Sequence, residues 1–192
     1  MPPSKIPLDQ FAILKGYSKE WRERLERNPH LAAYIAELGG KGLQNLPTLV
    51  EQLSRDMAAI RKPNIIYPVG DPVYIHIYPD PQTGSIVYHP IEPRLKKDRE
   101  RILEGVERLL AANVGDEDAP RDPAERELLL NKVIGKLFPK GAKIKLPSGI
   151  EITVTEELLT QLKYEIYCEK IGVSLLEPMI RDPFIEDIHC SG

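Results

Sequence analysis

The sequence predicts an α+β fold, because the spacing of its apolar residues changes along the chain. Helical spacing in roughly the first sixty residues is followed by strand-like alternation between residues 64 and 91, and helical spacing returns from residue 94. With 192 residues, 42% of them hydrophobic and 29% charged, the chain can bury a core of its own. We therefore expect an N-terminal helical bundle, followed by a small sheet of antiparallel hairpins packed with helices.

Three helices are expected before the first strand. Ser18 can cap a first helix, and Asn28-Pro29 can start a second helix that ends at Gly39-Gly40. Pro47 is expected to open a third helix that reaches Ile60, because apolar residues recur there at intervals of three and four. The N-terminal region is therefore predicted to be helical throughout.

A β-hairpin is expected after these helices. Residues 73–78 alternate between β-branched and aromatic or histidine side chains, and residues 85–91 can return as an antiparallel partner. The intervening Asp80–Gly84 supplies turn residues, since proline presets φ and glycine accepts a positive φ. A strand over residues 64–69 is expected to join this hairpin.

Prolines, glycines and capping residues set the limits of the remaining elements. Asp122-Pro123, for example, combines a capping aspartate with proline in the first helical turn, and Thr155 can cap a later helix. The expected elements are helices at 94–115, 123–137 and 156–171, a hairpin of 144–146 with 150–154, a short helical segment at 174–180 and a strand at 185–190.

These patterns divide the chain into three expected segments. Residues 1–63 form the helical start, and residues 64–172 form a mixed α/β domain. Residues 173–192 are expected to be a linker and the first strand of a second domain that continues beyond this sequence.

Composition excludes several classes of protein. The formal net charge of −3 arises from 26 basic and 29 acidic residues mixed along the chain, so nucleic-acid binding is not expected. The apolar runs are far shorter than the roughly 20 residues that cross a bilayer, and the first residues do not resemble a signal peptide. A cytoplasmic location is therefore expected. Cys168 and Cys190 lie far apart without metal-site spacing, so both are expected to be reduced thiols.

Three blocks of the sequence resemble archaeal ATPases of the type II secretion, type IV pilus and archaellum class. Residues 66–81 resemble a strand region of these ATPases, and residues 88–95 resemble their Tyr-x-x-x-Glu-Pro-x-Leu pattern. Residues 175–188 are similar to the entry into the PAS-like domain that precedes the ATPase core. The residues that carry the resemblance are Tyr67, Pro68, Pro72, Tyr74, His76, Tyr88, Glu92, Pro93, Asp182, Pro183, Glu186 and Asp187.

The resemblance implies an N-terminal regulatory or docking domain of a hexameric motor. Such a domain would lie at the inner face of the cell membrane and couple ATP hydrolysis to a membrane platform protein. Its partners would be the remainder of the ATPase, the neighbouring hexamer subunits and that platform protein, while ATP and Mg²⁺ would bind elsewhere in the parent. This chain contains no GxxxxGK[ST] run for binding phosphates, so we expect no ATP hydrolysis, no cofactor and no metal in this part, and a monomer in isolation.

A basic cluster near the N-terminus is a candidate docking surface for an acidic loop or an anionic lipid surface. Glu20, Glu23 and Glu26 interleave with it, so pairing within the helix and exposure to solvent is the other interpretation. The basic residues are Lys15, Lys19, Arg22, Arg24 and Arg27.

Aromatic and histidine side chains of the hairpin suggest a second kind of function. Tyr74, His76, Tyr78, Tyr88 and His89 could gather on one face, as in a stand-alone nucleotide or small-molecule binding module. The other interpretation is a half-buried sheet surface packed by helices, since strands favour such residues.

Overall fold

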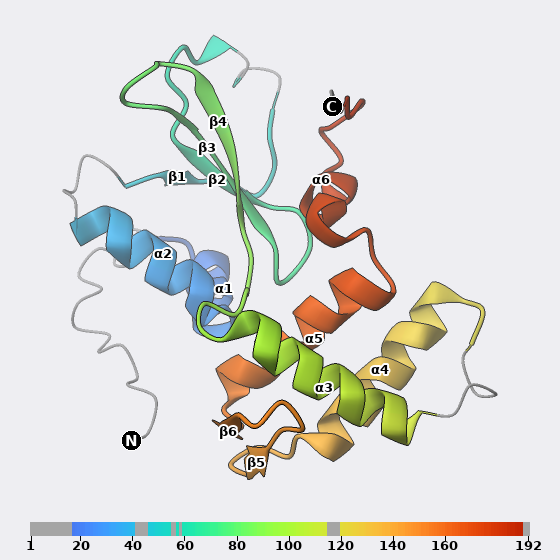
Figure 1. Cartoon of the computed structure of the whole chain (residues 1–192). Helices are drawn as coiled ribbons and strands as arrows, with labels where there is room; N and C mark the ends of the chain where they lie inside the picture. Colours follow the sequence, from blue (N-terminus) through green and yellow to red (C-terminus); the bar gives the residue numbers. More distant parts are fainter. Residues whose placement is uncertain (1–16, 41–45, 55–56, 58, 115–119, 190–192) are drawn as a thin grey trace. The chain divides into compact units, whose positions relative to one another are not determined.

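The computed structural model describes residues 17–40, 46–54, 57, 59–114 and 120–189 (Figure 1). The chain has an α+β fold, as predicted, and divides into two compact units. We call Met1–Glu92 together with Pro178–Gly192 the sheet unit, and Pro93–Glu177 the helical unit. The three segments expected from the sequence have other limits, because the chain after residue 177 belongs with the sheet.

Within the described residues, the sheet unit has a mixed sheet of four strands in the order β1-β2-β3-β4. Strands β1 and β2 are parallel, whereas β2, β3 and β4 are antiparallel neighbours. The predicted hairpin and the strand before it are thus confirmed. The strands are β1 (Thr48–Leu49), β2 (Ile65–Pro68), β3 (Tyr74–Pro79) and β4 (Ile86–Ile91).

The turn between β3 and β4 forms as its residues predict. Asp80 Oδ1 accepts hydrogen bonds from the backbone N–H groups of Gln82 and Thr83, at 2.7 and 2.8 Å. Gly84 then takes a φ of 71°, which a residue without Cβ adopts at little cost. The local sequence therefore fixes the register of this hairpin.

Helices α1 (Lys19–Arg27) and α2 (Pro29–Gly40) pack against one face of this sheet. The Ser18 side chain caps α1 by accepting from the Trp21 N–H at 3.3 Å, as predicted. Both helices contribute apolar residues to the core that they share with the sheet. Its buried members are Trp21, Leu25, Leu31, Ala32, Ile35, Ile66, Tyr74 and Ile91.

The helix predicted from Pro47 to Ile60 is wrong. Thr48–Leu49 forms strand β1, and the N–H groups of Thr48 and Val50 donate to carbonyl groups of the chain around β2, at 2.8 and 2.9 Å. The prediction rests on Pro47 and on the helical spacing of apolar residues, but pairing with the edge of β2 satisfies the same backbone groups. Ile60 is 46% exposed, so the expected apolar stripe is not buried along its length.

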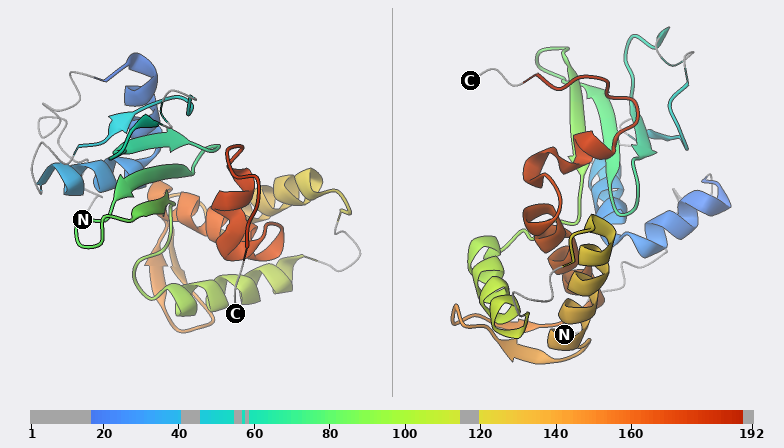
Figure 2. Two further views of the ribbon diagram at one scale, coloured as in Figure 1. Left: turned by 90° about the horizontal axis from the view of Figure 1, so that it is seen from above. Right: turned by 90° about the vertical axis from the view of Figure 1, so that its right-hand side faces the viewer.

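Over its described residues the helical unit has three long helices and a short hairpin, which Figure 2 shows from two further sides. Its core combines apolar residues of all these elements, such as Leu103, Ile134, Ile152 and Leu162. The predicted hairpin and the predicted helices are confirmed, with one shift in a boundary. The elements are α3 (Arg99–Asn113), α4 (Pro123–Leu137), β5 (Lys143–Lys145), β6 (Glu151–Thr153) and α5 (Glu156–Lys170).

Capping explains where these helices begin. The Asp122 side chain accepts from two N–H groups at the start of α4, and Thr155 accepts from the Leu158 N–H at the start of α5. Helix α3 begins at Arg99 and not at the predicted Arg94. The Leu95 N–H donates to Glu165 Oε1 at 3.1 Å, which holds the preceding segment outside the helix.

The segment after α5 contains a 3-10 turn (Ser174–Leu176) and the short helix α6 (Glu177–Arg181). The strand predicted at residues 185–190 is absent over 185–189, and Cys190 lies outside the described residues. Within the described residues no strand pairs with this segment, and a strand needs such a partner for its backbone hydrogen bonds.

The longest helices, α3, α4 and α5, have 15 residues each. In the part of the chain that the structure describes, no helix is long and apolar enough to cross a membrane.

Candidate functional site

Two tyrosines of the sheet hold the side chain of Asp182. The hydroxyl groups of Tyr67 and Tyr88 both donate to Asp182 Oδ2, at 2.7 and 2.9 Å. The N–H of Phe184 donates to Asp182 Oδ1 at 2.9 Å. Asp182 is only 3% exposed, so these donors take the place of water around its carboxylate. We call this arrangement the carboxylate anchor.

Strand geometry brings the two tyrosines together. Tyr67 on β2 pairs with Ile75 of β3, and Tyr88 on β4 pairs with Ile77 of β3. Ile75 and Ile77 are two residues apart, so Tyr67 and Tyr88 project from the same face of the sheet. Asp182 follows α6 directly and reaches that face.

The protonation of the tyrosines suits this contact. Burial raises the pKa of Tyr67 above its ordinary value, and the hydrogen bond to Asp182 and the negative charge of Asp182 raise the pKa further. The same three causes raise the pKa of Tyr88. Both hydroxyl groups therefore stay protonated at neutral pH and can donate. The anchor fixes the segment after α6 on the sheet.

The anchor contains one residue from each of the three blocks singled out in the sequence. Tyr74, another residue of the first block, faces the opposite side of the sheet, where its hydroxyl donates to Asp71 Oδ1 at 2.6 Å. Pro68 ends β2, and the peptide bond between Asp71 and Pro72 is cis. The other block residues follow β4 or lie exposed after Asp182, and they are Glu92, Pro93, Pro183, Glu186 and Asp187.

His76, also of the first block, lies in a closed set of contacts on the helix-facing side. Its Nδ1 is 2.8 Å from the Tyr34 hydroxyl, and its Nε2 is 2.8 Å from Asn64 Oδ1. An amide oxygen accepts hydrogen bonds, so with this Asn64 orientation Nε2 carries the proton and Nδ1 accepts from Tyr34. His89, the cross-strand partner of His76, stacks on the Tyr34 ring at a centroid distance of 5.2 Å.

The structure therefore divides the expected aromatic face. Tyr74, His76 and His89 belong to the helix-facing side, where Tyr78 contacts His76 with ring centroids 4.5 Å apart. Tyr88 projects from the other side and joins the carboxylate anchor. His76 is 2% exposed, and both of its ring nitrogens have partners within the unit.

We expect the sheet unit to lose stability in mild acid because of His76. Burial, with a contribution from the nearby His89, lowers the pKa of His76 to about 4. The unfolded state, with an ordinary pKa of about 6.5, then binds more protons, so stability falls as the pH falls from about 6.5 towards 4. Between pH 7 and pH 5 the free energy of unfolding should drop by about 2 kcal/mol. Urea unfolding followed by Trp21 fluorescence measures this, because Trp21 is the single tryptophan and lies in the sheet unit.

Burial also lowers the pKa of His89, so His89 adds to the loss in the same direction. The variant His76→Gln has no titrating group at this position and should lose most of the difference between pH 7 and pH 5. An equal difference in the wild type and in this variant would contradict the assignment to His76.

The basic cluster is partly engaged in ion pairs. Lys19 lies 3.8 Å from Glu23 within α1, whereas Arg24 and Arg27 reach acids outside the helix. Arg24 pairs with Glu51 at 2.8 Å, and Arg27 pairs with Asp71 at 3.2 Å. Arg22 is exposed, and Lys15 lies outside the described residues. A docking role for this cluster stays a prediction.

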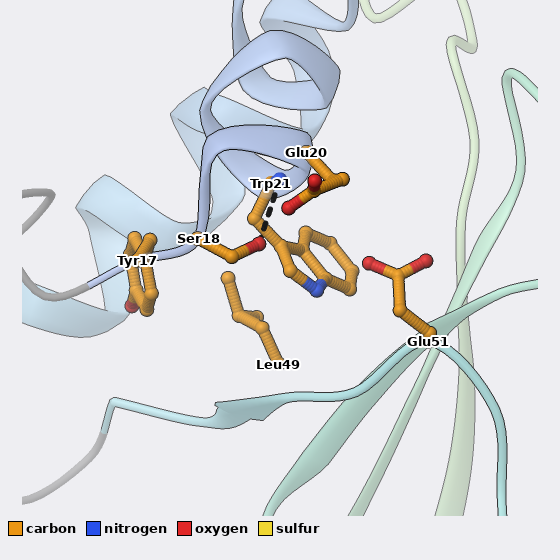
Figure 3. A pocket seen from close by; sticks show the side chains of 6 residues that line it. All are labelled: Tyr17, Ser18, Glu20, Trp21, Leu49 and Glu51. Atoms are coloured by element: carbon orange, nitrogen blue, oxygen red, sulfur yellow. Dashed lines mark hydrogen bonds between the residues drawn. The ribbon is translucent and has the colours of Figure 1, made fainter.

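An open pocket of about 380 Å³ lies between the start of α1 and the chain at β1 (Figure 3). Three of its lining residues present rings or an apolar side chain, and two present carboxylates. The indole ring of Trp21 stands between Leu49 and the two glutamates (Figure 3). The lining residues are Tyr17, Ser18, Glu20, Trp21, Leu49 and Glu51.

Sequence reasoning missed this pocket. The helix predicted from Pro47 to Ile60 does not include the strand β1 that brings Leu49 and Glu51 to α1. The pairing of β1 with β2, which creates the pocket, is a contact between distant segments that local spacing does not show.

Among the residues with described structure, no three His, Cys, Asp or Glu side chains lie together as possible ligands. Cys168 is buried in α5, and Cys190 is outside the described residues.

Comparison with known proteins relates the chain to a longer archaeal protein. No protein-family model matches the chain. The chain is 33% identical over 187 residues to the uncharacterized protein MJ0900 of Methanocaldococcus jannaschii, a match that covers 90% of this chain. It covers 33% of that protein, so the chain spans about a third of the length of this relative.

Proposed function

We propose that this chain is the N-terminal, non-catalytic docking part of a hexameric archaeal ATPase that serves a type II secretion, type IV pilus or archaellum system. The carboxylate anchor carries the proposal. Tyr67 and Asp182 are 115 residues apart, and with Tyr88 they come from the three blocks that resemble these ATPases. Blocks inherited together from one domain are expected to converge in space, whereas chance matches have no reason to meet.

Similarity to a much longer archaeal protein supports a role as one part of a larger polypeptide. In this proposal the remainder of the ATPase binds ATP and Mg²⁺ and forms the hexamer with neighbouring subunits. This part lies at the cytoplasmic face of the membrane and transmits the motor's movement to a platform protein. The anchor suits such a role, because it fixes to the sheet the segment that resembles the entry into the next domain.

Capture of the platform protein tests the docking function. The chain is immobilised and exposed to the cytoplasmic loops of the platform protein encoded beside the full gene, with the longer ATPase immobilised in parallel. We expect both to retain the loops. Retention by the ATPase alone would contradict a docking role for this chain.

Calorimetric titration with ATP and ADP tests the other function considered from the sequence. A docking part without a phosphate-binding loop is expected to give no binding heat with either nucleotide. Submicromolar binding would favour a stand-alone nucleotide-binding module and contradict the proposal.

A further inference from the structure

The open pocket beside α1 is a surface hollow to which the docking function assigns no role. Its volume of about 380 Å³ falls within the range of sites that hold a small ligand or a side chain of a partner. Tyr17, Trp21 and Leu49 provide apolar walls, and Glu20 and Glu51 provide negative charge. No basic residue is among its lining residues.

Trp21 offers an unused hydrogen-bond donor in this pocket. The residue is 3% exposed, yet in the part of the chain that the structure describes its indole N–H has no acceptor. Figure 3 shows the indole nitrogen on the edge of the ring nearer Leu49 and Glu51. The indole nitrogen itself reaches solvent in the open pocket, so an acceptor that a ligand brings, such as a backbone carbonyl, would take the place of water there.

The charges of the pocket favour a cation. The backbone of Glu20 and the Ser18 side chain form hydrogen bonds that lower the pKa of Glu20, so its carboxylate is ionised at neutral pH. Glu51 already binds one guanidinium group, that of Arg24, at 2.8 Å. The same guanidinium lies 5.6 Å from the centroid of the Trp21 ring. This local contact shows that the acidic and aromatic surface accommodates a basic group.

Strand β1 adds a backbone surface next to the pocket. Among the described strands it lies at the edge of the sheet, and Thr48 and Val50 direct their N–H groups towards β2. Because successive residues of a strand direct their backbone groups to opposite sides, those of Leu49 point away from β2. An extended segment can add to such an edge through main-chain hydrogen bonds.

We propose that this pocket binds an extended basic segment of a partner polypeptide, which lies along β1 and places a lysine or arginine between Glu20 and Glu51. A backbone carbonyl of the segment accepts from the Trp21 N–H, and an apolar residue contacts Leu49 and Tyr17. The inference rests on the docking function proposed above and identifies the chemistry of the docked segment. An acidic peptide would meet the carboxylates of Glu20 and Glu51 in this pocket, whereas the candidate basic cluster of α1 lies outside the pocket lining.

Peptide titration of the full chain tests this proposal. One peptide alternates arginine with valine, and its matched control carries glutamate in place of arginine. Trp21 fluorescence reports binding at the pocket, since it is the single tryptophan, and calorimetry reports binding to all variants. We expect the basic peptide to bind and the acidic peptide not to bind. Equal binding of both, or binding of neither, would overturn the proposal.

Two variants locate the site. Glu20→Gln removes a pocket charge, and Trp21→Phe removes the indole N–H while keeping an aromatic ring. Each should weaken the affinity for the basic peptide about fivefold. Glu26→Gln is the matched control, because Glu26 is an exposed residue of α1 outside the pocket lining, and it should leave affinity unchanged. Circular dichroism confirms folding of each variant, and unchanged affinity in both pocket variants would overturn the proposal.

Further measurements test other occupants of the pocket, and they distinguish a failure of the pocket proposal from a failure of the docking function. If arginine amide binds as tightly as the basic peptide, the pocket takes a single cation and not a segment of a partner. If a peptide of residues 1–16 of this chain binds more tightly than the basic peptide, the occupant is this chain's own segment. Either result would overturn the proposal. If Glu20→Gln and Trp21→Phe capture the platform loops as strongly as the wild type does, the pocket proposal is overturned and the docking function stands. Binding of the basic peptide without any capture of platform loops would support the pocket and contradict the docking function.

Discussion

Replacing Asp182 with alanine should lower the free energy of unfolding of the sheet unit by about 3–4 kcal/mol, because two charge-assisted hydrogen bonds worth roughly 1.5–3 kcal/mol each disappear. The loss also leaves the buried hydroxyl of Tyr67, a residue 1% exposed, without its acceptor. Urea unfolding followed by Trp21 fluorescence isolates this effect, since the single tryptophan lies in the sheet unit. The helical unit, followed by hydrogen exchange of α5, should keep its stability.

The neighbouring Asp187 provides the matched control. Asp187 is exposed and lies five residues further along the same segment, so Asp187→Ala should change the free energy of unfolding by less than about 0.5 kcal/mol. Tyr88→Phe removes one of the two hydroxyl donors and should cost about 1–2 kcal/mol. Equal stability of Asp182→Ala and Asp187→Ala would show that the anchor does not hold the segment on the sheet.

A double-mutant cycle tests whether Tyr88 and Asp182 act through one another. Once Asp182 is alanine, the Tyr88 hydroxyl has no carboxylate to donate to, so adding Tyr88→Phe should cost much less than in the wild type. Full additivity of the two substitutions would mean that their effects arise from separate contacts.

Elements whose causes are local were predictable from the sequence. The β3–β4 turn depends on Asp80 and Gly84, whose effects act within a few residues. Helix starts at Ser18, Asp122 and Thr155 likewise depend on side chains that bond to N–H groups two or three residues away. Such contacts can be inferred from spacing alone.

Contacts between distant segments were not predictable in this way. The chain around Leu49 has apolar spacing that suits a helix, and it becomes a strand because the edge of β2 is available to it. Tyr67, Tyr88 and Asp182 were each noticed, but their spacing along the chain did not show that one carboxylate receives both hydroxyl groups. The pocket at Trp21 depends on the same distant pairing, so a helix predicted over residues 47–60 does not predict the pocket.

Replacing Glu165 with alanine should destabilise the helical unit by about 3 kcal/mol, at the lower end of the range for breaking a buried ion pair. Glu165 is 0% exposed and accepts from Arg94 at 3.0 Å, from Arg99 at 2.7 Å and from the Leu95 N–H at 3.1 Å. The effect stays at the lower end because the side chains of Arg94 and Arg99 are 22% and 38% exposed and can turn towards water.

The net pKa shift of Glu165 gives this prediction a pH dependence. Burial alone would raise the pKa of Glu165, but the hydrogen bonds from Arg99, Arg94 and the Leu95 N–H outweigh it, so the pKa is lowered. A lowered carboxylate pKa stabilises the folded state above the ordinary value of about 4.3, and this contribution is lost as the pH falls through the lowered value. The His76 effect in the sheet unit begins near pH 6.5, so the two units should lose stability in different pH ranges.

Hydrogen exchange of the α5 amides measures the Glu165 effect, because the tryptophan does not report on the helical unit. At neutral pH, Glu165→Ala should raise the exchange rates of the most protected α5 amides more than a hundredfold, which corresponds to about 3 kcal/mol. Glu127→Ala, at an exposed position of α4, is the matched control and should leave these rates nearly unchanged. Glu165→Gln keeps the side-chain volume but removes the charge, so the α5 exchange rates of this variant should lie between those of Glu165→Ala and those of Glu127→Ala. If Glu165→Ala exchanges like Glu127→Ala, the bonds to Arg94, Arg99 and Leu95 do not stabilise the unit, and the late start of α3 at Arg99 needs another cause.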